Sequence, residues 1–260
     1  MDFSSNSKLK TQNSKLAILL PIYSLWKREL ILFIRQPSLI IGTIGLPLVF
    51  WFVFGLRAQG EHFQALFATA AIFVIVSASI GSSYTVISDH NLGFLKSLLV
   101  SPVSNAQLVF GKILGCATTA MLQALIFLLL APHLTFEKAV LSIAGLFVVA
   151  LTLCSFGFLL AWPMDSAHGF HLIVNLALIP MWLLSGGLFG MTAMPNWLNW
   201  IVKLNPLYYA TQGLSGIFFL ESSSNLMMIS QNLAIVFSFG AVLFLICLFM
   251  VKLRTRSHLD

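Results

Sequence analysis

The chain has 260 residues and a formal net charge of +6, with 58% hydrophobic and 8% charged residues. Soluble domains carry about 25% charged residues, so this composition excludes a soluble globular protein. The apolar segments are continuous rather than alternating, which excludes a transmembrane β-barrel. The expected fold class is therefore an all-α membrane protein. The positive charge is interpreted by its position relative to the membrane, and no nucleic-acid partner is expected.

The first 36 residues are expected to precede the membrane spans. Residues 1–15 are polar and are predicted to form a disordered cytoplasmic tail. Residues 16–36 are predicted to form an amphipathic helix lying in the membrane interface, with Trp26 away from its polar face. An ordinary basic lead-in to the first span is the alternative. The predicted polar face consists of Ser24, Lys27, Arg28 and Arg35.

Six apolar segments approach the length of about 20 residues that a membrane span requires. They form one predicted six-span domain over residues 37–251, and residues 252–260 follow as a cytoplasmic tail. The predicted spans are Ser38–Leu56, Gln64–Ser88, Ala106–Ala131, Ala139–Ala161, His168–Gly190 and Asn232–Val251.

The distribution of Lys and Arg predicts the orientation. Of the 14 such residues, eleven lie in the N-terminal segment, the connection between spans two and three with its flank, and the C-terminus. Only Arg57, Lys138 and Lys203 lie on the opposite side. Cytoplasmic segments carry an excess of cations, so both termini and the connection near residues 89–106 are predicted to be cytoplasmic.

Residues 191–231 do not fit a simple external loop. They are mostly apolar and rich in Trp and Tyr, which favour the membrane interface, yet prolines and glycines interrupt them too often for one span. Backbone that is irregular at membrane depth must be buried in protein or line a wet cavity. We therefore expect one or two short re-entrant or interfacial helices on the outer side.

The stretch from residue 89 to 112 interrupts the apolar pattern. Leu92, Leu95, Leu98 and Leu99 share one helical face, whereas Lys96 and Ser97 point elsewhere. Pro102 then opposes a continuous helix, and the sequence SNAQ at residues 104–107 is typical of a capping box that begins span three. The pattern predicts a short cytoplasmic helix that docks by its leucines on a partner protein. An interfacial helix without a partner is the alternative.

No motif for catalysis, metal binding or nucleotide binding is identified. The chain lacks the G-x-x-x-x-G-K-[ST] phosphate loop, and LSGG at residues 184–187 lies inside an apolar segment. The three cysteines are interpreted as small core residues. No charge occupies the centre of a predicted span, so energy for transport is expected from a partner. Two alternatives stay open: a stand-alone channel or secondary transporter, and an intramembrane enzyme using Asp165, His168 or Ser185.

Two stretches carry a family resemblance. GFLKSLLVSPVSNAQLVFGK, residues 93–112, resembles the loop motif of ABC type-2 transporter permeases, which include the membrane subunits of daunorubicin and nodulation-factor exporters. Residues 183–214 are similar to the C-terminal stretch of that family: a Ser-Gly turn, then P-x-W-L, then NPL-x-Y. The matching outer residues are Pro195, Trp197, Asn205, Pro206 and Tyr208.

The resemblance implies a non-catalytic membrane subunit of an exporter for drugs, lipids or lipid-linked glycans. It implies a second copy of this chain or a related permease, two ABC ATPase subunits that bind ATP and Mg, and no cofactor in the chain itself. It also implies a bacterial inner (plasma) membrane location, an N-terminal helix that leans on the ATPase, and a coupling helix that enters the ATPase cleft. The implied coupling residues are Asp89, Gly93, Leu95, Lys96, Leu98, Leu99 and Pro102.

The chain departs from the family where many relatives carry more charge in this loop. His90, Asn91, Ser97 and Asn105 occupy positions near which relatives often have arginine or glutamate. Docking through this loop is therefore expected to depend on the leucines more than on ion pairs.

Overall fold

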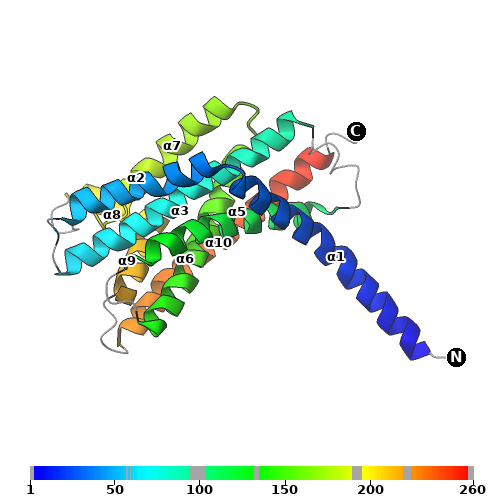
Figure 1. Ribbon diagram of the computed structural model, residues 1–260, viewed down its shortest axis with the longest axis horizontal. Helices are drawn as coiled ribbons and strands as arrows, with labels where there is room; N and C mark the ends of the chain where they lie inside the picture. Colours follow the sequence, from blue (N-terminus) through cyan, green and yellow to red (C-terminus); the bar gives the residue numbers. More distant parts are fainter. Residues whose placement is uncertain are drawn as a thin grey trace.

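The computed structural model describes residues 3–56, 58, 60–93, 103–131, 135–188, 195–218 and 224–256. Within these ranges every regular element is an α-helix, as expected for an all-α membrane protein. The helices pack into an elongated bundle, from which the N-terminal part of α1 projects (Figure 1). They are α1 (Phe3–Ile34), α2 (Pro37–Gly55), α3 (Gly60–Asn91), α5 (Asn105–Leu128), α6 (Phe136–Ala161), α7 (Ala167–Leu183), α8 (Asn196–Leu204), α9 (Pro206–Phe218) and α10 (Ser224–Arg256).

Five of these helices are long and apolar enough to cross a membrane: α2, α3, α5, α6 and α10. They coincide with five of the six predicted spans. The fifth predicted span, His168–Gly190, is shorter than expected, because α7 ends at Leu183 after 17 residues. The prediction of six full-length spans is therefore supported for five, and α7 is a shorter apolar helix.

Asn205 explains why α7 stops early. Its side-chain amide donates to the carbonyl of Leu184 at 3.1 Å and to that of Met181, two acceptors at the C-terminal end of α7. Helix ends leave such carbonyls without partners inside the helix, so an external donor stabilises the end. Gly186, with φ of +81°, then turns the chain in a left-handed conformation that L-residues rarely adopt.

The N-terminal helix differs from the prediction. A disordered tail was expected at residues 1–15, followed by a helix at 16–36, but α1 runs without interruption from Phe3 to Ile34. No glycine or proline occurs in this polar stretch before Pro21, and the helix also continues through Pro21. The polarity of the first residues predicted disorder, whereas the absence of a helix-breaking residue allows the helix to extend.

The centre of the bundle is α3, which packs against α2, α5, α6, α7 and α9. Aromatic side chains join these helices: Phe67 of α3 stacks on Phe127 of α5 with ring centroids 4.9 Å apart, and Phe73 stacks on Trp182 of α7 at 4.0 Å. All three cysteines are buried, as expected for core residues. Two of them, Cys116 of α5 and Cys154 of α6, also form a disulfide that the sequence analysis did not anticipate.

Two glycines bring α1 close to α5. An added Cβ at Gly111 would lie 2.9 Å from Cβ of Leu25, and one at Gly115 would lie 2.7 Å from Cβ and Cγ of Glu29. Small residues four positions apart allow close helix packing in membranes. Because Leu25 and Glu29 are also four residues apart, both contacts lie along one line between the two helices.

This close contact gives a first prediction. Gly115→Ala is expected to destabilise the protein by about 1–3 kcal/mol, because the added methyl group must displace Glu29 or the α1 backbone. Gly42→Ala is the control, since nothing lies within 4 Å of a Cβ at that position. Alanine favours helix by about 1 kcal/mol over glycine, so the control is expected to be neutral or stabilised. Thermal unfolding in detergent measures both, and a Gly115→Ala midpoint equal to that of Gly42→Ala would contradict the packing argument.

Candidate coupling site

The predicted coupling segment leaves the end of α3 and enters the start of α5, and both ends are defined. Gly93 lies two residues after the last residue of α3 and has φ of +72°, the left-handed conformation that glycine often adopts just after a helix ends. At the other end, the Ser104 hydroxyl accepts from the Gln107 backbone N–H at 3.3 Å, and the Gln107 side chain accepts from the Ser104 N–H at 2.8 Å. The predicted capping box is therefore confirmed.

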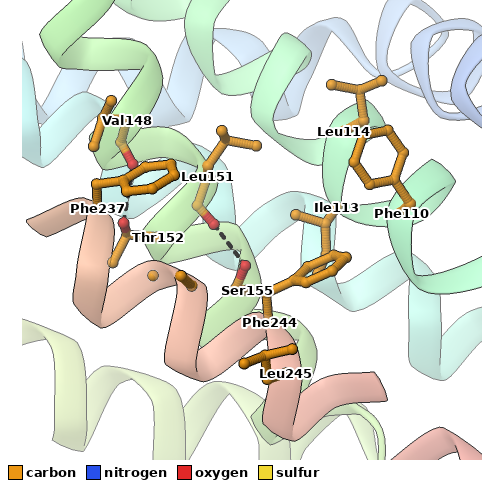
Figure 2. A pocket seen from close by; sticks show the side chains of 12 residues that line it. Phe110, Ile113, Leu114, Val148, Leu151, Thr152, Ser155, Phe237, Phe244 and Leu245 are labelled. Carbon is orange, nitrogen blue, oxygen red and sulfur yellow. Dashed lines mark hydrogen bonds between the residues drawn. The ribbon is translucent and has the colours of Figure 1, made fainter. Parts of the chain in front are cut away.

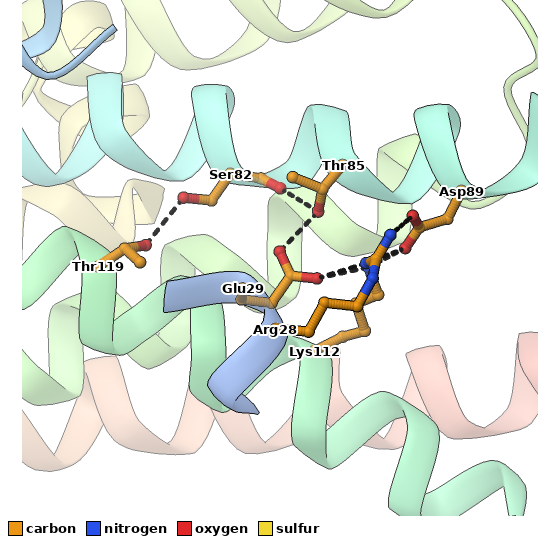
Figure 3. Close-up of polar contacts among 7 residues, drawn as sticks. All are labelled: Arg28, Glu29, Ser82, Thr85, Asp89, Lys112 and Thr119. Atoms are coloured by element: carbon orange, nitrogen blue, oxygen red, sulfur yellow. Dashed lines mark hydrogen bonds and ion pairs between the residues drawn. The ribbon is translucent and has the colours of Figure 1, made fainter. Parts of the chain in front are cut away.

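Four charged side chains meet beside these two ends, drawn in Figure 3. Arg28 and Glu29 come from α1, Asp89 from the last turn of α3, and Lys112 from the second turn of α5. Arg28 forms a two-pronged ion pair with Asp89, with one N–H···O distance of 2.9 Å. Lys112 Nζ donates to Glu29 Oε1 at 2.6 Å and also to Asp89.

Glu29 joins the charged cluster to neutral side chains. Its second carboxylate oxygen accepts from the Thr85 hydroxyl of α3 at 2.9 Å. One turn earlier on α3, Ser82 shares a 2.9 Å hydrogen bond with Thr119 of α5. One turn before Glu29 on α1, the Trp26 indole N–H donates to the Thr118 hydroxyl of α5 at 3.0 Å. Polar contacts therefore bind α1, α3 and α5 to one another over several turns.

The charges in this cluster balance. Two cations face two carboxylates, and Glu29, Asp89 and Lys112 are only 4%, 1% and 4% exposed. Buried charges are stable only when they are paired and hydrogen-bonded, and removing one partner leaves an uncompensated charge. Arg28 differs from the others because 29% of its side chain is exposed, so the cluster reaches water at one edge.

The predicted coupling residues fall into three groups. Asp89 is an internal residue of α3, buried and paired with Arg28 and Lys112. Gly93 lies directly after that helix. The remaining predicted coupling residues lie outside the described residues: Leu95, Lys96, Leu98, Leu99 and Pro102.

The structure gives the residues predicted for the N-terminal helix different surroundings. Lys27 and Arg35 are exposed, whereas Arg28 turns toward Asp89. Trp26 is half-buried against α5 through its contact with Thr118. This part of α1 is therefore anchored to the protein by residues that the sequence analysis had placed on different faces.

The predicted outer region contains two short helices, α8 and α9. Pro195 precedes α8, on which Trp197 is 66% exposed, while Asn205 and Pro206 are buried where α9 begins. The Asn205 side chain accepts from the N–H of Leu207 at 3.0 Å, so the residue that closes α7 also caps α9. Burial, and secondarily the neighbouring Tyr209, raises the pKa of Tyr208.

The residues considered for an intramembrane enzyme have other surroundings. Asp165 contacts His90 at 3.3 Å, and His168 is exposed. The Ser185 hydroxyl is buried without a hydrogen-bond partner among the described residues, so no base there contacts it. Across the same residues, no three His, Cys, Asp or Glu side chains gather as a metal site.

An apolar cavity of about 360 Å³ lies between α5, α6 and α10 (Figure 2). The hydroxyls of Thr152 and Ser155 on its wall donate to backbone carbonyls of α6, at 2.9 and 2.8 Å, and are therefore occupied. Phe237 and Leu245 at its edge are 58% and 63% exposed. The cavity is thus a hydrocarbon-lined hollow that offers no polar recognition.

Sequence reasoning missed Glu29 and the role of Lys112. A usable signal existed for Lys112, because it lies inside the predicted span Ala106–Ala131, and an ionisable residue inside a span requires a partner. Glu29 follows Arg28 directly and was overlooked in favour of the basic face of the helix. Their pairing joins residues 83 positions apart, and no local pattern specifies it.

The burial of Asp89 gives a second prediction. Asp89→Asn leaves two cations facing one carboxylate, so it is expected to cost about 3–5 kcal/mol of stability. Asp165→Asn is the control, because 72% of the Asp165 side chain is exposed, and its ion pair is expected to contribute about 0–1 kcal/mol. Thermal unfolding in detergent micelles compares the two. Equal midpoints for both variants would show that the cluster does not hold α1, α3 and α5 together.

Comparison with known proteins agrees with the motifs. The chain is 26% identical over 251 residues to a putative transport permease, Ycf38, from Cyanophora paradoxa, with 86% of this chain and 87% of the relative covered. The Ycf38 protein of Porphyra purpurea is 24% identical over 204 residues, covering 71% and 69%. A probable multidrug ABC transporter permease of Escherichia coli K12, YbhR, is 27% identical over 157 residues, or 59% of this chain and 43% of that protein.

A family model supplies the assignment. The model of the ABC-2 type transporter matches residues 21–219, which include α2 to α9, the anchored part of α1 and the predicted coupling segment. The matched region thus contains the charged cluster, both ends of the coupling segment and the Asn205 cap. The chain is a multi-pass membrane protein and belongs to the ABC-2 type transporter family of transport permeases.

Proposed function

We propose that this chain is the membrane subunit of an ATP-driven exporter and that separate ABC ATPase subunits, two per complex, hydrolyse the ATP. The family assignment supports a permease role. The observation that carries the proposal further is the charged cluster beside both ends of the 93–103 connection. In this proposal ATP and Mg bind to the partner, and the chain has no catalytic residue.

The cluster suggests how motion enters the membrane domain. Lys112 of α5 binds Asp89 of α3, so the two helices that flank the connection are tied together. A force applied to the connection therefore acts on both helices at once. From α3 the displacement passes to α2 and α7, which pack against it. In the proposed cycle, ATP binding closes the ATPase, the connection moves, and α2, α3 and α7 shift.

A second copy of the chain is proposed to cover α2 and α7. Only 17% of the spanning window of α2 is buried, and Leu172 and Leu176 of α7 are 71% and 74% exposed. Both helices pack on α3, so a two-fold partner at this face would sit beside the moving helices. The proposed location is the bacterial inner (plasma) membrane with both termini in the cytoplasm, supported by the distribution of Lys and Arg.

The proposed substrate is hydrophobic or amphipathic: a drug, a lipid or a lipid-linked glycan. The name of YbhR describes that protein as a probable multidrug permease, which favours this class over small ions. The alternative of a stand-alone channel or secondary transporter gains no support from the charged cluster. Its carboxylates are engaged by Arg28, Lys112 and Thr85 rather than free to exchange an ion.

Docking through the leucine face gives a third prediction. Leu95→Asp and Leu98→Asp are each expected to abolish association with the ATPase, because a charge replaces a buried apolar anchor. Ser97→Asp is the matched control, since it adds the same charge to the same segment away from the predicted leucine face. The ATPase that co-purifies with the wild-type chain, identified by its phosphate-loop sequence, is co-expressed with each variant, and ATP hydrolysis of the purified complex is measured.

Two results would count against the exporter proposal. One is an ATPase that remains bound and active with both leucine variants, which would contradict docking at this segment. The other is substrate transport by the purified chain in vesicles without ATPase or ATP, which would favour the stand-alone transporter.

The proposed dimer gives a fourth prediction. Leu176→Cys on α7 is expected to form a disulfide-linked dimer on mild oxidation in membranes, because the same residue of a second copy lies near the two-fold axis. Phe249→Cys on α10, 62% exposed, is the control and is expected to remain monomeric. The native Cys247 is buried and does not compete. Equal cross-linking at both positions, or none at Leu176→Cys, would contradict this face as the interface.

A further inference from the structure

Glu29 of α1 contacts α3 through the Thr85 hydroxyl and α5 through Lys112. We propose that Glu29 is a positioning residue for coupling: it fixes α1 to the ends of α3 and α5, so that these three segments move as one body when the 93–103 connection is displaced. The inference rests on the proposed function, since it assumes that an ATPase drives that displacement.

The first argument is the set of partners around the Glu29 carboxylate. Oε1 accepts from Lys112 Nζ at 2.6 Å, and Oε2 accepts from the Thr85 hydroxyl at 2.9 Å. Oε1 also lies 3.4 Å from Arg28 Nη1, whose guanidinium holds Asp89. One carboxylate therefore links α1 directly to both other helices (Figure 3). No neutral side chain could replace it without leaving a buried cation short of charge.

The second argument is steric. The Glu29 side chain lies over Gly115, where an added Cβ would be only 2.7 Å from Cβ and Cγ of Glu29, so any larger residue at position 115 would displace that side chain. Trp26 adds a hydrogen bond to Thr118 on the next turn of α5. The stretch of α1 from Leu25 to Glu29 is thus held by packing as well as by charge. The N-terminal part of α1 projects from the bundle (Figure 1).

The third argument separates Glu29 from Arg28. The ion pair of Glu29 with Lys112 is enclosed, because the two side chains are 4% and 3% exposed. Arg28 is 29% exposed, so water can replace part of its contact with Asp89 during motion. A fixed link must lie where water cannot compete for the charges. The geometry therefore assigns the fixed contact between α1 and α5 to the ion pair of Glu29 with Lys112, whereas the Arg28 pair lies at the exposed edge of the cluster.

The test measures whether α1 and α5 move together. Spin labels are placed at Ile31 of α1 and Leu122 of α5, both exposed, and their distance distribution is recorded for the chain in nanodiscs and for its complex with the co-purified ATPase. Spectra are compared without nucleotide and with ATP plus vanadate. In the wild-type complex the Ile31–Leu122 distance is expected to stay constant within about 2 Å, the scale of small helix shifts.

Glu29→Gln is expected to free α1. It should broaden the Ile31–Leu122 distribution in nanodiscs and make the mean distance depend on nucleotide, while ATPase association is retained. Lys112→Gln in the Glu29→Gln background restores charge balance and is expected to narrow the distribution again. Thr85→Val removes the hydroxyl that donates to Glu29 but leaves every ion pair in place, and it is expected to have a smaller effect. Lys27→Gln is the control, because it removes a charge from an exposed neighbour.

The outcomes separate this inference from the proposed function. A Glu29→Gln chain with the wild-type distribution in both nucleotide states would overturn the positioning role while leaving the exporter proposal intact. A wild-type distance that changes with nucleotide as much as in the variant would also overturn it, because α1 would then move independently. A wild-type chain that binds no ATPase would overturn the proposed function and the coupling role with it, even if the nanodisc data show a firm joint.

Discussion

A balanced set of buried charges holds α1, α3 and α5 of this permease together. Two cations and two carboxylates from three helices meet where water is largely excluded, so none can leave without exposing another to an unfavourable environment. A purely apolar contact would permit sliding, because hydrocarbon surfaces have no preferred register. The ion pairs define a register between α1, α3 and α5. Close packing on Gly111 and Gly115 then requires that register to be kept.

The junction of α7 and α9 is organised by a neutral counterpart of this arrangement. Asn205 donates to the last carbonyls of α7 and accepts from the N–H of Leu207 in the first turn of α9. One amide therefore defines where α7 ends and where α9 begins. Trp182 of α7 donates to the Thr69 carbonyl of α3 at 2.9 Å, which ties the same region to the central helix. Charge thus joins α1, α3 and α5, whereas backbone capping joins α7 and α9.

Local patterns predicted the helical parts of this fold well. Hydropathy identified α2, α3, α5, α6 and α10 because a run of about 20 apolar residues is typical of a helix that crosses a membrane. The Ser104–Gln107 box marked the start of α5 because it acts on backbone groups a few residues away. At residues 3–15 the polarity of the sequence predicts a disordered tail, whereas the structure describes these residues as part of α1.

Contacts between distant residues could not be predicted in the same way. The end of α7 depends on Asn205, 21 residues beyond Leu184, and the pairing of Glu29 with Lys112 spans 83 residues. The disulfide between Cys116 and Cys154 likewise depends on how α5 and α6 face each other. Residue types suggested that such groups needed partners, but only the packing of helices selects which partner each one has. The charge count predicts an orientation but does not reveal that Arg28 and Lys112 pair with Asp89.

Pro21 has a consequence for the mechanics of α1. The helix continues through this residue, but proline lacks an N–H and cannot donate to the carbonyl of Ala17, so one rung of the backbone ladder is missing. The missing bond lies one turn before Leu25, where α1 becomes tightly held by α5. Bending stiffness is therefore lowest directly outside the clamp. The part of α1 before Pro21 can therefore change its direction when it contacts a partner, while the turn held by α5 keeps its position.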